Sequence, residues 1–294
     1  MNGLLIVDKP KGITSQSVCL KIKRMLGIKK CGHNGTLDPN ATGVMVVALD
    51  NATKLLKFIH EHDKEYIATI AFGLDSKTLD MDSEITNRIE MNPSIDDIKN
   101  ALEELKRRKV QTPPLTSAVK IDGMKLYEYQ RKGIEVEVPE REVTLYDYEI
   151  VSELRNTCGY FEIDIRLFVS KGYFVRSLAR DLGILLGGAA ILKDLRRTKS
   201  GEYKIEDAIP LEEIKENHVI SIFDFFKFPK VYVKDYMIPL VKNGITMDER
   251  QTNIHEPFYV DSKEGILAIY EEVDHLKYKP VLLLGGDRSG NSLR

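Results

Sequence analysis

The most informative segment of the chain is Gly32-His33-Asn34-Gly35-Thr36-Leu37-Asp38-Pro39-Asn40-Ala41-Thr42-Gly43. Its glycines permit tight turns and positive φ angles. Pro39 restricts the backbone of Asp38 to extended conformations, which fixes the direction of the carboxylate. A lone aspartate in a loop is usually a turn former or a helix cap. The flanking glycines favour a second interpretation, in which the loop holds a reactive carboxylate beside rigid strands.

The elements on either side of this segment follow from the hydrophobic pattern. The apolar run at residues 3–7 predicts a buried strand, and Asp8 to Gly12 forms a turn signal. Thr14 or Ser15 can cap a following helix. The apolar face of that helix is expected to carry Val18, Ile22 and Met25. A second apolar run, residues 44–49, follows the glycine-framed segment, which we expect to be a polar loop.

Farther along the chain, strands and helices alternate without a regular rhythm. Residues 66–72 and 161–169 read as strands, the second because apolar and polar residues alternate in it. Helices are expected after Ser94, closed by the basic residues 106–109, and around Leu178, Leu182 and Leu185. A further short helix is expected at residues 210–216. This arrangement favours an α+β fold with a mixed or antiparallel sheet.

The hydrophobic pattern of the sequence changes near residue 229. Short apolar runs separated by Gly, Asp and Pro predict strands at 231–233, 258–260, 265–270 and 280–284. We therefore expect a domain of residues 1–228 and a small β-rich domain of residues 229–294. The glycine-rich polar tail, residues 285–294, is expected to lack regular structure.

Composition narrows the class of protein. The net charge is only −2, but residues 1–30 hold seven basic residues and one acidic residue. Residues 201–294 hold twelve basic and seventeen acidic residues, so a surface facing a polyanion is expected in one part of the molecule only. The three cysteines show no zinc-site spacing and favour a reducing, cytoplasmic compartment. The apolar runs are too short to cross a membrane.

The segment 32–43 resembles the second signature motif of the TruB-type pseudouridine synthases. Eleven of its residues fit that pattern, and Asn34 stands where the family commonly has Thr. Five further segments resemble family motifs in the expected order. They are the opening strand and turn at 3–12, Asp63-Lys64-Glu65-Tyr66, the segment 113–133, and Ser170 to Leu178 followed by Leu195-Arg196-Arg197-Thr198.

This resemblance implies a fold and an activity. The expected fold is the pseudouridine synthase fold, a mixed, largely antiparallel sheet flanked by helices, with a PUA-like C-terminal domain. A segment at about 110–145 would grip RNA. The implied reaction is the isomerisation of uridine-55 in the T-loop of tRNA to pseudouridine. The implied enzyme uses no cofactor and no metal, binds the tRNA T-stem-loop as its partner, and acts as a monomer.

The resemblance also assigns roles to residues. Asp38 would be the nucleophile, Arg176 the cation that keeps it charged, and Tyr66 the ring that stacks on the target uracil. Six further residues would bind substrate: Lys9, His33, Phe174, Leu195, Lys120 and Arg131. Phe174 stands where the family usually has Tyr, so its ring can pack but no hydroxyl role carries over. Each of these lysines and arginines could alternatively be an ordinary solvated side chain.

Three other functions remain open at this point. A non-catalytic tRNA-binding or tRNA-folding protein would keep the basic residues without needing Asp38 and Arg176 together. A glycosidase or nucleosidase usually needs two positioned acids, and the motif offers one. A guide-RNA-dependent pseudouridine synthase would share the motifs but would not act on naked tRNA.

Overall fold

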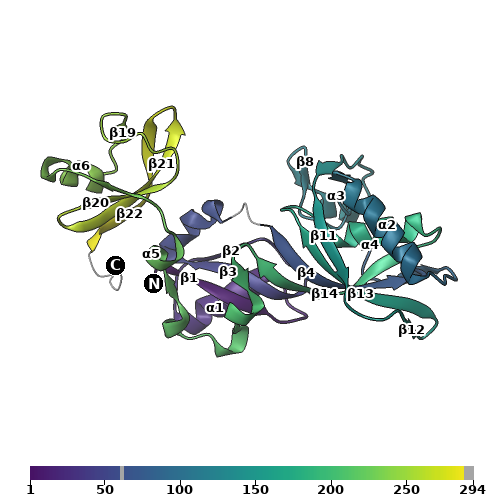
Figure 1. The fold of residues 1–294 in the computed structure, drawn as a ribbon. Coiled ribbons are helices and arrows are strands. Elements are labelled where there is room, and N and C mark those ends of the chain that lie inside the picture. Colours follow the sequence, from purple (N-terminus) through teal and green to yellow (C-terminus); the bar gives the residue numbers. More distant parts are fainter. Residues whose placement is uncertain (60–62, 288–294) are drawn as a thin grey trace.

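One large sheet carries the site. The computed structural model describes residues 1–59 and 63–287, and within them the hydrogen-bonded order is β11-β13-β4-β14-β3-β1-β16 (Figure 1). These strands are β1 (Gly3–Lys9), β3 (Thr42–Leu49), β4 (Lys64–Phe72), β11 (Leu145–Ile150), β13 (Tyr160–Val169), β14 (Ala190–Ser200) and β16 (Ile209–Pro210). Along this path only β14–β3 and β1–β16 are parallel, so the prediction of an α+β fold with a mixed, largely antiparallel sheet is confirmed.

Shorter strands pair along the same sheet. They are β2 (Cys31–Asn34), β12 (Arg155–Thr157), β15 (Tyr203–Lys204) and β17 (Ile220–Ser221). Strand β2 corrects one expectation, because the polar loop predicted from Gly32 begins only at Gly35. Residues 31–34 instead pair antiparallel with residues 46–49 of β3, which supplies their backbone hydrogen bonds.

The two halves of the sheet meet at a very short junction. Strand β14 lies between β4 and β3, and it pairs with β3 only at Arg196↔Thr42 and Arg197↔Gly43. Gly43 has a φ of +107°, and a Cβ built on it would lie 2.1 Å from the carbonyl oxygen of Arg197. The final glycine of the motif is therefore required by the close approach of a neighbouring strand.

Helix α1 (Ser15–Leu26) packs against the β1–β3 half of the sheet. Its N-cap is Thr14, whose hydroxyl accepts a hydrogen bond from the Ser17 amide at 3.0 Å. Val18 and Ile22 are fully buried, as the pattern predicts. Met25, expected on the same face, is 42% exposed, so that prediction was wrong. The helix places Leu26 against this core instead, one position farther around the turn.

Helices α2 (Ile95–Arg107) and α4 (Val175–Leu185) cover the other half. Both contribute to one apolar cluster with β4 and β13, and they lie beside each other in Figure 1. Ser94 and Asp97 form a reciprocal capping box at the start of α2, and Lys106 and Arg107 occupy its last turn. The predicted helix bounds are thus confirmed. Strand β13 alternates buried and half-buried residues along most of its length, also as predicted.

Several short elements lie outside the two large sheets. They are η1 (Asp50–Phe58), α3 (Leu126–Lys132), and the two-stranded pairs β5 (Leu74–Ser76) with β6 (Ile85–Arg88), β7 (Val110–Gln111) with β10 (Arg141–Glu142), and β8 (Lys120–Ile121) with β9 (Met124–Lys125). The single helix expected at 210–216 is absent from this described part. Pro210 ends strand β16, and two separate 3₁₀ turns follow, η3 (Leu211–Glu213) and η4 (Glu216–His218). Burial of Leu211 and Ile214 holds the chain in this irregular path.

The C-terminal region forms a separate sheet in the order β18-β20-β21-β22-β19. Its elements are β18 (Lys230–Tyr232), η5 (Asp235–Met237), α6 (Ile238–Lys242), β19 (Met247–Asp248), β20 (Phe258–Ser262), β21 (Gly265–Asp274) and β22 (Lys277–Asp287). All four predicted strands are present. Strand β22 continues three residues beyond the predicted start of the tail, and residues 288–294 lie outside the described residues.

This second sheet shares an apolar cluster with the first. Tyr259, Ile269 and Leu282 pack with Leu4 and Ile6 of β1. Helix α5 (Ile222–Phe225) lies between the two sheets in Figure 1, and the Tyr259 hydroxyl donates to the Ile222 carbonyl at 3.1 Å. The division at residue 228 therefore stays a prediction. No helix in the described part of the chain is long and apolar enough to cross a membrane.

Candidate active site

The loop that carries Asp38 is held from behind by buried polar groups. The Ser15 hydroxyl donates to the Leu37 carbonyl at 3.0 Å and accepts from the Leu37 amide at 2.9 Å. The Gly12 amide donates to the Pro39 carbonyl at 2.9 Å. These contacts fix both neighbours of Asp38, so the opening strand–turn–helix of the chain forms a rigid support for the carboxylate.

Lys9 belongs to this support rather than to the surface of the site. Its ammonium donates to the carbonyls of Pro10, Pro39 and Ala41 at 3.0, 2.9 and 2.7 Å, and the residue is 0% exposed. Burial lowers its pKa to about 8, with Asp38 acting in the opposite direction. Lys9 is therefore buried under the loop that carries Asp38, and its expected role in binding substrate stays a prediction.

Arg176 and Asp38 form a bidentate ion pair. Its Nη2 lies 3.0 Å from Oδ1 of Asp38, and its Nε lies 3.0 Å from Oδ2. Such parallel contacts fix the carboxylate in direction as well as in charge. The Arg176 side chain is 7% exposed, whereas that of Asp38 is 39% exposed. The acid therefore faces solvent while its cation is covered.

Two further segments hold the guanidinium of Arg176. Its Nη1 donates to Thr116 Oγ1 at 2.6 Å and to the Thr78 carbonyl at 3.1 Å, and its Nη2 donates to the Thr116 carbonyl at 3.1 Å. Asp80 Oδ2 lies 3.6 Å from the same Nη1. Burial raises the pKa of Asp80, opposed by hydrogen bonds from Thr78 and Asp82 and by Arg176. Arg176 thus has a fixed position before any ligand arrives.

The start of helix α4 aims Arg176 at the loop. Phe174 is the N-cap residue, and Gln111 binds its backbone on both sides, donating to the Phe174 carbonyl at 3.0 Å and accepting from its amide at 2.8 Å. The Ser177 hydroxyl donates to the Thr112 carbonyl at 2.8 Å. The N-terminal end of a helix favours negative charge, which suits the position of Asp38.

Asp38 and Arg176 line a cleft of about 1270 Å³. Of the residues predicted to act on the nucleotide, Tyr66, Phe174, Leu195 and Lys120 also line it. Tyr66 is 7% exposed and comes from β4, and Leu195 comes from the adjacent β14. The cleft therefore combines one charged pair with aromatic and aliphatic walls, which is how a flat base could be held.

Besides the buried Lys9, two predicted residues do not line this cleft. His33 lies on β2, opposite Val47 of β3, and is half-buried. Arg131 lies near the end of α3 and is exposed. Arg131 stands on the segment that borders the cleft, so a contact with a larger ligand outside the cleft remains geometrically open to it.

Arg197 is the functional residue that the sequence left without a role. It is 1% exposed, and its Nε donates to the Val44 carbonyl at 2.7 Å while Nη2 donates to the Gly35 carbonyl at 3.1 Å. It thereby ties both ends of the Asp38 loop to strand β14. Its position in the Leu-Arg-Arg-Thr segment was the available signal. Arg196, its neighbour, pairs instead with Asp8 at 2.8 Å.

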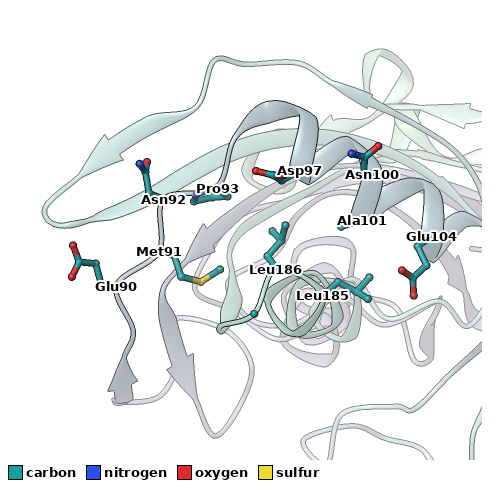
Figure 2. A pocket seen from close by; sticks show the side chains of 11 residues that line it. Glu90, Met91, Asn92, Pro93, Asp97, Asn100, Ala101, Glu104, Leu185 and Leu186 are labelled. Carbon is teal, nitrogen blue, oxygen red and sulfur yellow. The ribbon is translucent and has the colours of Figure 1, made fainter.

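A second hollow, of about 550 Å³, lies on another part of the molecule (Figure 2). Asp97, Asn100 and Glu104 of α2 form one wall, and Leu185 and Leu186 at the end of α4 form another. None of the predicted site residues lines it. Across residues 1–59 and 63–287, no group of three or more His, Cys, Asp or Glu side chains is arranged to hold a metal ion.

Comparison with known proteins decides the family. Residues 23–175 match the model of the TruB family pseudouridylate synthase N-terminal domain, and residues 176–224 match the tRNA pseudouridylate synthase B C-terminal domain. The chain belongs to the TruB family of pseudouridylate synthases. The family is an isomerase family that acts on RNA, so the hypothesis that the motifs carry is confirmed at this level.

Curated relatives match most of the length of this TruB-family chain. The tRNA pseudouridine synthase B of Acholeplasma laidlawii is 36% identical over 95% of the chain and 98% of its own length. That of Borrelia garinii is 34% identical over 96% and 99%. That of Geobacillus thermodenitrificans is 38% identical over 83% and 85%.

Solved structures support the same fold. The Cbf5 chain of a Cbf5-Nop10-Gar1 complex is 25% identical, with a TM-score of 0.65 over 96% of this chain and 83% of that one. A chain of an H/ACA RNP bound to a substrate RNA has a TM-score of 0.63 at 21% identity, over 99% and 87%. The latter likeness concerns the fold alone. The pseudouridine synthase fold with a strand-rich C-terminal region is thus the fold of this protein.

Proposed function

We propose that this protein converts uridine-55 in the T-loop of tRNA to pseudouridine, with Asp38 as the nucleophile. The observation that carries the proposal is the half-exposed carboxylate of Asp38, fixed at 3.0 Å by a buried Arg176 inside a cleft with aromatic walls. Relatives that bear the name tRNA pseudouridine synthase B support tRNA as the substrate.

The residues act in sequence on one nucleotide. The target base leaves the T-loop and enters the cleft, at a cost of a few kcal/mol that contacts to the RNA backbone offset. Tyr66 and Leu195 hold the ring, and Phe174 closes the wall beside it. The Asp38 carboxylate attacks the flipped nucleotide and forms a covalent adduct, the N1–C1′ bond breaks, and the base turns. C5 then joins C1′ and the bond to Asp38 breaks, which frees the carboxylate. C5 loses its proton and N1 gains one, so the product is an isomer of the substrate.

Arg176 has two tasks in this scheme. It places a fixed positive charge beside the carboxylate of Asp38, and it holds both carboxylate oxygens in one orientation. Because Thr78 and Thr116 fix the guanidinium, little reorganisation is needed during the reaction.

The test is Asp38→Asn, assayed on an unmodified tRNA transcript by mapping pseudouridine at single-nucleotide resolution. We expect isomerisation to be lost by at least about a thousand-fold, while tRNA binding stays within a few-fold. Asp147→Asn is the matched control, because Asp147 is exposed and pairs with Lys106 away from the cleft. Substantial turnover by Asp38→Asn would refute the assigned nucleophile.

The same assay separates the other functions. Product at position 55 of naked tRNA excludes the need for a guide RNA. Tight binding by the wild type without any product would identify a tRNA-binding protein, and release of free uracil would identify a glycosidase. Either of the last two results would overturn the proposal.

A further inference from the structure

Three cationic side chains gather at one end of the cleft. Lys64 begins strand β4, and its partner across the sheet is Val169, the last residue of β13, two positions before Lys171. On the other side of β4, Arg197 of β14 pairs with Tyr66. Because β13, β4 and β14 are neighbours, the three cations lie near the same end of these strands, and all three line the cleft.

Two of these cations converge on Gly35, in the loop that carries Asp38. A methyl group placed on Gly35 would lie 3.4 Å from Arg197 Nη1 and 3.6 Å from Lys64 Cε. Gly35 therefore leaves open the space between them. Arg197 is 1% exposed and Lys64 8% exposed, so little water reaches their charges.

The cations at this end of the cleft repel one another. The pKa of Lys64 falls to about 8, first through burial, then through the repulsion of Arg197 and, more weakly, of Lys171, with Asp63 as the opposing acid. Asp63 itself accepts a hydrogen bond from the Tyr146 hydroxyl at 3.1 Å. A site that holds several poorly solvated like charges is stabilised when an anion enters it.

We propose that Lys64 and Lys171 form a subsite for one backbone phosphate of the RNA, next to the nucleotide that enters beside Asp38, with the charge of the buried Arg197 behind it. This inference rests on the proposed function only in taking RNA as the ligand. A phosphodiester fits because it is a compact anion with several acceptor oxygens, and both Lys and Arg donate to such groups. It would anchor the strand on one side of the flipped nucleotide, so these cations are positioning residues and none attacks the base.

The experiment measures binding of a T-stem-loop hairpin in an Asp38→Asn background, so that no turnover disturbs the equilibrium. Kd is measured between 50 and 300 mM salt for the background protein and with Lys64→Gln or Lys171→Gln added. Each added change should weaken binding about ten-fold at low salt and reduce the slope of log Kd against log salt by about 0.7 to 0.9. Lys99→Gln is the control, because Lys99 stands on α2 outside the cleft and should leave the slope unchanged.

A second measurement locates the phosphate. Hairpins that each carry one neutral methylphosphonate linkage are compared with the natural hairpin. One of these hairpins carries the neutral linkage in place of the phosphate that Lys171 binds, beside the target nucleotide. For that hairpin Lys171→Gln should not weaken binding further, because the charge is already absent. In an otherwise wild-type chain, Lys171→Gln should raise KM about ten-fold and change kcat little.

Unchanged salt slopes in both lysine variants would overturn the inference, as would equal losses with every hairpin. A fall in kcat at saturating RNA with an unchanged slope would instead assign Lys64 to the chemistry, and would also overturn it. Lys171 is exposed, so Lys171→Gln remains a test if Lys64→Gln fails to fold. Failure of the proposed function is a separate result, because it is the absence of pseudouridine with the wild-type chain.

Discussion

The absence of a side chain at Gly43 allows strands β3 and β14 to lie close together beside the site. Any Cβ at this position would meet the Arg197 carbonyl at 2.1 Å, in a backbone with a φ of +107°. We expect Gly43→Ala to lower the free energy of unfolding by about 3 kcal/mol or more, and to reduce activity strongly, because the strands must separate to admit the methyl group. Urea denaturation and the pseudouridine assay measure the two effects.

Gly12 provides the matched control for that prediction. It also has a positive φ, +85°, but a Cβ there would find nothing within 4 Å. Gly12→Ala should therefore lower the free energy of unfolding only by the cost of the backbone conformation, about 1 kcal/mol. Equal losses in the two variants would contradict the claim that the close approach of β14 is the cause.

Lys9 makes stability depend on pH in a defined direction. Its pKa is about 8 in the folded chain, against an ordinary value of 10.5. Between pH 8 and pH 10.5 the unfolded chain binds more protons than the folded chain. The contribution of Lys9 to the free energy of unfolding therefore grows as pH rises from 8 to 10.5, and it is lost as pH falls through 8. The free energy of unfolding of the wild type, minus that of Lys9→Met, should therefore increase from pH 7.5 to pH 10. A constant difference in urea denaturation would contradict this.

At the level of single residues, the sequence predicted the acid and its cation but not their supports. Asp38, Arg176 and Tyr66 stand in motifs, so resemblance assigned them to one site, and the structure places them around one cleft. The contacts of Arg197 and Thr116 depend on which segments fold together, although the Leu-Arg-Arg-Thr segment drew attention to Arg197. Lys9 was assigned to the substrate by resemblance, and the sequence did not show its burial, which depends on a loop thirty residues away.

At the level of elements, two serines at the starts of helices α1 and α2 are expected to differ in their effects on stability and activity. Ser94 caps α2, far from Asp38, while Ser15 begins α1 and binds both backbone groups of Leu37. Ser94→Ala should cost about 1 kcal/mol of stability with kcat unchanged. Ser15→Ala should cost about 1 to 3 kcal/mol and also lower kcat about ten-fold, because the Asp38 loop loses its tie. Loss of kcat in Ser94→Ala, or none in Ser15→Ala, would refute this division.

Elements with long periodic patterns were predicted well, and the failures have local causes. Helices α1, α2 and α4 and strand β13 follow from their apolar spacing. Residues 31–34 read as loop because glycine and asparagine are poor strand formers, yet the exposed edge of β3 recruits them. Residues 210–216 have helical composition, but burial of Leu211 and Ile214 favours two short turns.

At the scale of the whole molecule, the shared apolar cluster predicts how the chain unfolds. Tyr259 of the C-terminal sheet packs with Leu4 and Ile6 of β1, and its hydroxyl donates to the carbonyls of Ile222 and Phe226. We therefore expect a single cooperative transition in calorimetry. Tyr259→Ala should separate it into two, because the main packing residue between the sheets is removed. Two transitions already present in the wild type would argue that the sheets unfold independently.

The position of β14 has a consequence for how the chain is made. The strand that joins the two halves of the sheet is Ala190–Ser200, although the strands it joins, β3 and β4, end at residues 49 and 72. A ribosome therefore releases β3 and β4 long before the strand that lies between them. During that interval the edges of β3 and β4 have no mutual partner, and they are open to wrong pairings with other nascent chains. Chaperone dependence in the cell should thus be set by the delay in synthesis between those two strands and residue 200.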